Sequence, residues 1–119
     1  MNFSEYQEAA HSFATYGEPG ETYPALGLSE EAGEVNGKIA KFLRKNKMLP
    51  FKAMGRKLLK AQCDEFRESI SKELGDTLWM LAEVATVYGL DLGAIAQENI
   101  DKLTDRKERG VIVGSGDER

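Results

Sequence analysis

Two pairs of acidic residues have the spacing of metal-binding carboxylates. Glu31 and Glu34 form an ExxE string, and Glu73 and Asp76 form an ExxD string. Residues three apart on a helix lie on one face, so each pair presents its two carboxylates together. Four carboxylates from two facing helices supply the hard oxygen ligands that Mg²⁺ or Mn²⁺ prefers. We therefore predict that Glu31, Glu34, Glu73 and Asp76 hold a divalent cation.

A helical wheel strengthens this prediction, because both pairs occupy the same edge of their apolar stripes. Measured at about 100° per residue from Leu28 and from Ile70, the first acid of each pair lies about 60° away and the second about 120°. A single acidic pair on a helix is usually a solvated surface feature, but several like charges at one edge repel one another without a cation. Each pair also encloses a glycine, which lowers helix stability. Close helix packing or close approach of a ligand would explain these glycines.

Glu30 precedes the first pair but lies about 160° from the centre of the apolar stripe. We therefore expect it to point away from the direct metal ligands. Two interpretations stay open, because Glu30 either reaches a second metal or a substrate-bound ion, or is a surface acid.

Apolar residues at helical spacing predict an all-α chain. The expected helices span residues 3–16, from 26–29 to about 45, 70–88 and 92–107, and a less regular helical segment spans 56–69. Glycine and proline predict breaks at 17–24 and 46–55, and the tail at 110–119 is expected to be non-helical. Ser29 and Asp91 are expected to cap helix starts, and Gly89 a helix end. These elements predict a single domain over residues 1–119 with a four- to five-helix bundle.

The composition is that of an ordinary soluble domain. The chain has 119 residues, of which 41% are hydrophobic and 30% are charged, with a net charge of −4. This charge argues against a polymeric nucleic acid as partner. The single cysteine, Cys63, excludes an intrachain disulfide and suits a reducing cytoplasm. Because neither a signal peptide nor an apolar run of membrane-spanning length is present, we expect a cytoplasmic protein without a membrane partner.

The segment 70–88 is apolar almost all round, which indicates burial on several sides. In a chain this short, part of the covering surface is expected to come from a dimer interface. The sequence thus predicts that homo-oligomerisation completes the bundle.

The two acidic motifs and their flanks resemble the EExxE…ExxD signature of the MazG-like nucleoside triphosphate pyrophosphohydrolases. The resemblance is carried by residues 27–35 and 72–79, extends to 5–10 and 99–106, and includes the ending at 114–117, so it covers nearly the whole chain. It implies cleavage of an NTP or dNTP between the α- and β-phosphates, giving the monophosphate and pyrophosphate. It also implies Mg²⁺ or Mn²⁺ and a homodimer or a dimer-of-dimers tetramer.

The chain departs from the family pattern in one respect. Residues 35–72 separate the two acidic pairs, a longer gap than the family usually has, and the extra length lies around 44–68. The acidic motif itself is intact. The longer segment bears on substrate choice and oligomer geometry rather than on the acidic motif.

A triphosphate needs positive charge beyond the metal ions. Residues 35–63 contain no acid and are rich in lysine and arginine. On the wheel, Lys38 projects near Glu31 and Glu34, so it is the best candidate in this stretch for a phosphate contact. The other basic residues of the stretch are interpreted as a solvated face.

The last expected helix carries three further candidates. Asn99 lies within about 20° of the centre of its apolar stripe and Arg106 within about 40°, with Lys102 at the edge. A buried asparagine that bridges helices is the alternative for Asn99. The family resemblance favours Asn99 near the sugar or phosphates, and Lys102 and Arg106 near the phosphates.

The expected mechanism is metal-assisted hydrolysis with two or more ions when substrate is bound. The ions bridge phosphate oxygens, and a water of lowered pKa attacks the α-phosphorus while Glu34 or Glu31 takes its proton. Phosphoribosyl-ATP pyrophosphohydrolysis and dUTP-specific hydrolysis on the same fold stay open as alternatives. So does a non-catalytic helical module that binds nucleotide or metal.

Overall fold

The computed structural model describes residues 1–17, 20 and 22–115. In this part of the chain every regular element is helical, which confirms the all-α class. The elements are α1 (Phe3–His11), α2 (Thr22–Asn46), α3 (Pro50–Ala53), the 3₁₀ turn η1 (Lys57–Leu59), α4 (Lys60–Val87) and α5 (Leu92–Glu108). Of the tail at 110–119, residues 110–115 are non-helical as expected, and 116–119 lie outside the described residues.

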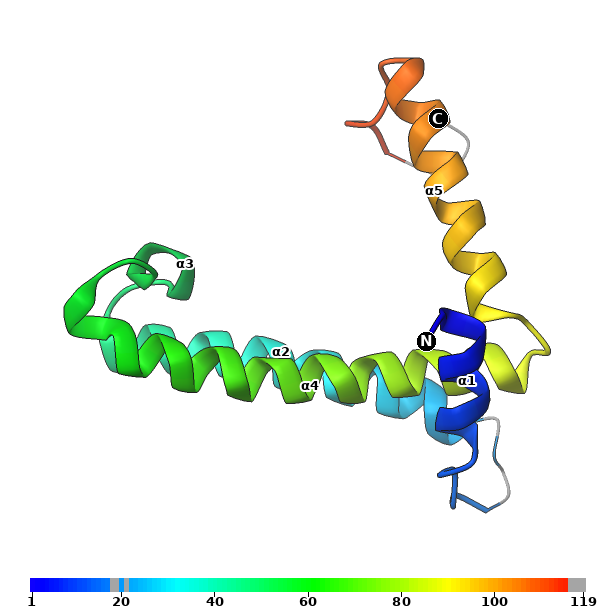
Figure 1. Cartoon of the computed structure of the whole chain (residues 1–119), viewed down its shortest axis with the longest axis horizontal. Helices are drawn as coiled ribbons and strands as arrows, with labels where there is room; N and C mark the ends of the chain where they lie inside the picture. Colours follow the sequence, from blue (N-terminus) through cyan, green and yellow to red (C-terminus); the bar gives the residue numbers. More distant parts are fainter. Residues whose placement is uncertain (18–19, 21, 116–119) are drawn as a thin grey trace.

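Two long antiparallel helices, α2 and α4, form the body of the molecule (Figure 1). The short α3 closes the far end of this hairpin, and α1 packs across the other end of α4. At the α3 end, a buried apolar cluster joins Phe42, Ala53, Cys63 and Phe66. The rings of Phe42 and Phe66 meet edge to face with centroids 5.2 Å apart, so α2 and α4 are held in register there.

The start of α2 differs from the prediction. The helix begins at Thr22, so Ser29 lies inside it and does not cap it. Pro24 occupies the first turn, where the missing N–H of proline removes no helical hydrogen bond. Because Pro24 is fully buried, it anchors this end of α2, and the loop predicted at 17–24 is correspondingly shorter.

Most of the segment predicted at 56–69 joins the segment predicted at 70–88 in one continuous helix, α4, of 28 residues, which follows the 3₁₀ turn η1. Its polar first half is supported by ion pairs one turn apart. Lys60 Nζ lies 2.6 Å from Asp64 Oδ2, and Lys72 Nζ lies 3.0 Å from Glu68 Oε1. Such pairs stabilise helices without an apolar stripe, which is why apolar periodicity alone gave only a less regular helical segment here.

The turn into α5 follows the prediction. Gly89 has a φ of 65°, a left-handed conformation that suits glycine at a helix end. The Asp91 carboxylate accepts a 2.7 Å hydrogen bond from the Ala94 N–H and so caps α5. Gln7 of α1 ties this turn down, since its side chain accepts from the Leu92 N–H at 2.7 Å and donates to the Leu90 carbonyl at 2.9 Å.

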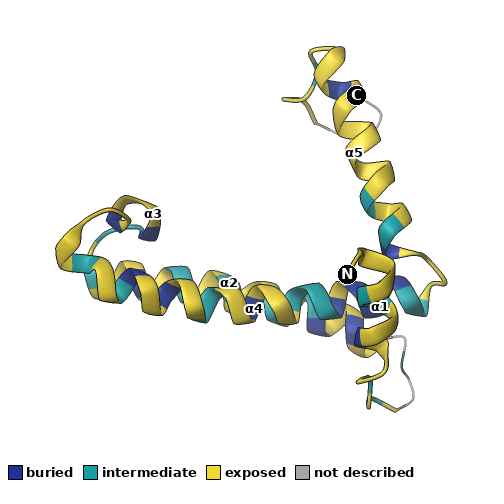
Figure 2. Ribbon diagram, viewed as in Figure 1, coloured by how far each residue is buried: buried dark blue, intermediate teal, exposed yellow. Residues whose placement is uncertain are grey.

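Helix α5 projects away from the hairpin (Figure 1). The segments Lys57–Val87 and Leu92–Glu108 meet at 102°, and α5 packs mainly against α1. Most of α5 is exposed (Figure 2), including Ile100 at 57% and Leu103 at 37%. The radius of gyration is 17.8 Å, against about 13.5 Å for a compact chain of this length. One copy of the chain therefore does not close the bundle around α5.

Among the described residues, no single helix is long and apolar enough to cross a membrane. The bent pair Lys57–Val87 and Leu92–Glu108 meets the test of length and composition only when its two arms are taken together.

Candidate functional site

Three of the four predicted metal ligands meet between α2 and α4. Glu31 comes from α2, and Glu73 and Asp76 come from successive turns of α4. Each offers a carboxylate oxygen, and these three oxygens all lie within 4.8 Å of one another. We call this group the acid cluster. Glu73 is nearly buried with 9% of its surface exposed, whereas Asp76 is open to solvent.

Glu34 and Glu30 lie around the acid cluster rather than within it. The pKa of Glu31 is raised, first by burial and then by the negative charges of Asp76, Glu34, Glu30 and Glu73. All of these carboxylates are therefore close enough to Glu31 to repel it. Glu30 and Glu34 are both exposed. The two acidic motifs thus converge as the helical wheel predicted, with Glu34 at the margin.

Lys38 partly neutralises the acid cluster. Its Nζ lies 2.8 Å from Glu73 Oε1. The hydrogen bond to Glu73 raises the pKa of Lys38, and the nearby charge of Glu34 adds to this rise. The same hydrogen bond lowers the pKa of Glu73. The sequence placed Lys38 near the acids, and the structure puts it in direct contact with one of them.

The donors of the acid cluster suit a small divalent cation. Carboxylate oxygens are the preferred ligands of Mg²⁺, and at metal–oxygen distances of about 2.1 Å two ligands of one ion are at most about 4.2 Å apart. The oxygens here lie within 4.8 Å of one another, so small side-chain adjustments bring them to coordination distance. Repulsion at Glu31 provides the driving force for such a rearrangement.

The glycines within the two motifs do not mediate close packing in this chain. A Cβ added at Gly33 or Gly75 would meet nothing within 4 Å. These positions leave open space beside the acids, which agrees with the close approach of a ligand. The close helix contact is elsewhere, at the buried Gly27, where a Cβ would lie 2.6 Å from Met80 Sδ.

The candidate residues of α5 are not brought to the acid cluster. Asn99 and Lys102 are exposed on α5, which leads away from the α2–α4 hairpin (Figure 1). The alternative of a buried asparagine that bridges helices is not seen within one chain, because Asn99 is exposed and α5 packs mainly against α1. Arg106 is 4% exposed at the end of α5, beside the segment that follows it.

A buried carboxylate that the sequence did not single out lies two turns beyond Asp76 on α4. Glu83 is fully buried, and its Oε2 accepts a hydrogen bond from the Tyr16 hydroxyl and lies 3.0 Å from His11 Nδ1. Its Oε1 has no hydrogen-bond partner in the described part of the chain. The only signal in the sequence is an acid inside an apolar run, and its partners come from a distant segment.

The Glu83 contacts fasten the segment after α1 to α4. Burial, followed by the bond to Glu83, raises the pKa of Tyr16, so its hydroxyl stays protonated and donates. Burial and the charges of Asp76 and Glu83 also raise the pKa of Tyr6, whose side chain senses both carboxylates. The acid cluster and Glu83 are thus electrostatically linked through one face of α4.

Replacing Tyr16 by Phe is expected to lower the free energy of unfolding by about 1–3 kcal/mol, because a buried carboxylate loses a hydrogen-bond donor. Urea denaturation followed by circular dichroism measures the change. Tyr23→Phe is the matched control, since Tyr23 stacks on Tyr16 with ring centroids 5.1 Å apart but is 55% exposed. Equal effects of the two substitutions would contradict the assigned role of the Tyr16 hydroxyl.

Comparison with known proteins agrees with this geometry. Residues 21–111 match the model of the MazG nucleotide pyrophosphohydrolase domain. The chain is also 35% identical to the gene 37 protein of Mycobacterium phage L5 over 127 residues, an alignment that covers all of both chains. No solved structure matches the chain significantly. The matched segment contains both acidic motifs, all of α2 and α4, and α5, so the chain belongs to the MazG nucleotide pyrophosphohydrolase domain family.

Proposed function

We propose that the protein hydrolyses a nucleoside or deoxynucleoside triphosphate between its α- and β-phosphates, releasing the monophosphate and pyrophosphate. The observation that carries the proposal is the acid cluster, three carboxylate oxygens within 4.8 Å of one another in a chain of this family. A divalent cation held by such a cluster would neutralise charge on a polyphosphate. A module that only packs helices would gain nothing from repelling carboxylates at its centre.

In this proposal Glu31, Glu73 and Asp76 bind Mg²⁺ or Mn²⁺, and Glu34 extends the site toward further ions that accompany the substrate. A divalent ion bound there supplies charge neutralisation on the phosphate oxygens and lowers the pKa of water. Glu30, exposed and close enough to repel Glu31, belongs to the outer margin of the site.

The chain's own side chains position the reactants. Glu34 is exposed at the margin of the acid cluster, where it accepts a hydrogen bond and then a proton from the attacking water. Lys38 has three donor hydrogens. It therefore keeps its contact with Glu73 while donating to a phosphate oxygen. Glu34 thus takes the proton that leaves the water, and Lys38 stabilises the negative charge on the phosphates.

The cleaved bond is tested by incubating the protein with Mg²⁺ and a panel of NTPs, dNTPs, dUTP and phosphoribosyl-ATP, and resolving the products. We expect pyrophosphate and a monophosphate product, and a loss of turnover by a factor on the order of 10³ in Asp76→Asn, as for removal of a major electrostatic group. Asp64→Asn is the control, because Asp64 lies on the same helix in an exposed pair with Lys60. Release of orthophosphate and a diphosphate would refute the proposed bond cleavage.

Metal binding is tested apart from turnover by thermal melting. With EDTA present, Glu31→Gln should melt a few degrees higher than the unaltered chain, because it removes one member of a repelling group. Adding Mg²⁺ should raise the melting temperature of the unaltered chain by mass action but leave that of Glu31→Gln nearly unchanged. A magnesium shift of the same size in both proteins would show that the ion binds elsewhere.

We further propose that α5 reaches the acid cluster of a second copy, in a homodimer or a dimer of dimers. Within one chain α5 turns away at 102° and exposes apolar side chains, among them Ile100 and Leu103. Burying this stripe against another subunit would close the bundle and remove apolar surface from water. It would also give the exposed Asn99 and Lys102 a route to substrate that their own chain does not offer.

Subunit mixing tests this arrangement. Asp76→Asn copies keep an intact α5, and Asn99→Ala/Lys102→Ala copies keep an intact acid cluster. If α5 acts on the partner, mixing equal amounts should restore about a quarter of the unaltered rate, since half of the dimers are mixed and each has one intact site. Asp76→Asn mixed with Glu73→Gln is the control, because both changes affect the acid cluster. No recovery in the first mixture would place the α5 residues outside the partner's site.

A further inference from the structure

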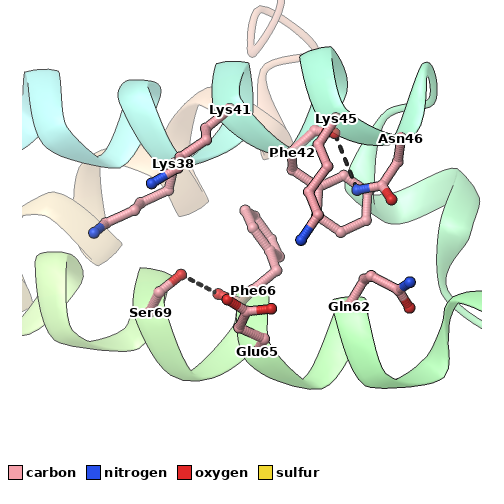
Figure 3. Close-up of a pocket in the computed structure, with 9 residues that line it drawn as sticks. All are labelled: Lys38, Lys41, Phe42, Lys45, Asn46, Gln62, Glu65, Phe66 and Ser69. Carbon is pink, nitrogen blue, oxygen red and sulfur yellow. Dashed lines mark hydrogen bonds between the residues drawn. The ribbon is translucent and has the colours of Figure 1, made fainter.

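A basic groove lies between α2 and α4 (Figure 3). Its lysines follow Glu31 along α2 in the direction of α3. Its volume is ≈ 240 Å³. Lys38, Lys41 and Lys45 line it from α2, and Phe42 and Phe66 form its floor. We call it the lysine groove. No residue of the groove apart from Lys38 belongs to the site described above.

The positive charge of the lysine groove is only partly compensated, because Lys38 pairs with Glu73 and Glu65 is in the lining. Among the described residues, neither Lys41 nor Lys45 has an ion-pair partner, whereas Lys60 and Lys72 pair with acids one turn away. Glu65 is the one carboxylate in the lining, against three lysines. The uncompensated positive charge gives the groove a preference for an anion.

The residues that line the groove are held in place by packing and by hydrogen bonds. Phe42 and Phe66 are 6% and 9% exposed and pack against each other, so their contact joins α2 and α4 beneath the lysines. Asn46 donates to the Phe42 carbonyl at 3.1 Å, and the Ser69 hydroxyl donates to the Phe66 carbonyl at 2.9 Å. An apolar floor also supports the aliphatic stems of the lysines while their ammonium groups reach an anion.

The size of the groove limits what it holds. Its ≈ 240 Å³ is below the range of about 300–1,000 Å³ typical of pockets for drug-sized ligands. A compact anion fits this space better than a complete nucleotide. The positive lining and small size together point to phosphate groups.

The lysine groove is continuous with the acid cluster through Lys38, which lines the groove and contacts Glu73 at 2.8 Å. Along α2, Lys41 lies about 4.5 Å and Lys45 about 10 Å beyond Lys38, at 1.5 Å per residue. An anion chain that starts at the acid cluster therefore meets a lysine on each successive turn. The opposite direction leads to α1, where the acidic Glu83 is buried.

We propose that the lysine groove binds the β- and γ-phosphates of the substrate and then the pyrophosphate product, an assignment whose ligand rests on the proposed function. Water oxygen bonds to the α-phosphorus, and the bond from that phosphorus to the bridging oxygen breaks. The bridging oxygen leaves with the pyrophosphate, and the water proton passes to a carboxylate. The groove thus sets the polarity of the substrate, with the phosphate tail toward α3 and the nucleoside toward α1.

The test is direct binding of inorganic pyrophosphate to the full chain in Mg²⁺, measured by titration calorimetry. Lys41→Gln and Lys45→Gln should each weaken pyrophosphate binding about tenfold, as expected for one hydrogen bond to a charged group. Affinity for a nucleoside monophosphate should stay within a factor of about two, since a single charge-assisted contact acts only on the group that it touches. Arg44→Gln is the matched control, because Arg44 is an exposed neighbour of Lys45 that does not line the groove.

The outcomes separate the groove from the proposed function. Three results would each refute pyrophosphate binding in the groove, whatever the turnover. They are an unchanged pyrophosphate affinity in both lysine variants, an equal loss of affinity in Arg44→Gln, and an equal loss of affinity for the monophosphate. Lysine-dependent pyrophosphate binding without cleavage of any nucleotide would uphold the groove as an anion site and refute the proposed function. Circular dichroism of each variant confirms that the exposed substitutions leave the helices intact.

Discussion

Repulsion among carboxylates held between α2 and α4 is the constraint on which the rest of the structure depends. Packing of the two helices brings oxygens of Glu31, Glu73 and Asp76 within 4.8 Å of one another, and the pKa of Glu31 is raised as a result of its burial and of these charges. This arrangement stores unfavourable energy at the centre of the molecule. A bound cation would relieve it, and within the chain Lys38 does so in part through Glu73.

The sequence predicted the acid cluster because its geometry is local. Spacing of three residues sets each pair on one helix face, and matching phases on two helices need only antiparallel packing to meet. The caps at Asp91 and Gly89 were predictable for the same reason, since each depends on a single residue and its backbone conformation. Features that depend only on residues within one helix turn can therefore be predicted from their spacing in the sequence.

The features that the sequence did not predict all depend on distant partners or on polar stabilisation. The start of α2 rests on Pro24, whose burial is decided by other elements, and α4 runs through a polar stretch because ion pairs support it. The role of Glu83 depends on Tyr16 and His11, which are distant in the sequence and contact it only in the folded chain. The departure of α5 likewise follows from a turn that α1 holds.

Helix α1 and the segment after it therefore contact both α4, which carries the acid cluster, and the turn that leads into α5. Through the segment that follows it, Tyr16 fastens this region to the buried Glu83 on the same helix as Asp76. Through Gln7 it holds the turn from which α5 leaves at 102°. The direction of α5 is thus set relative to the helix that carries the acid cluster rather than left to a free hinge. A second subunit that meets α5 meets it in a fixed orientation, which is what a site shared between two copies requires.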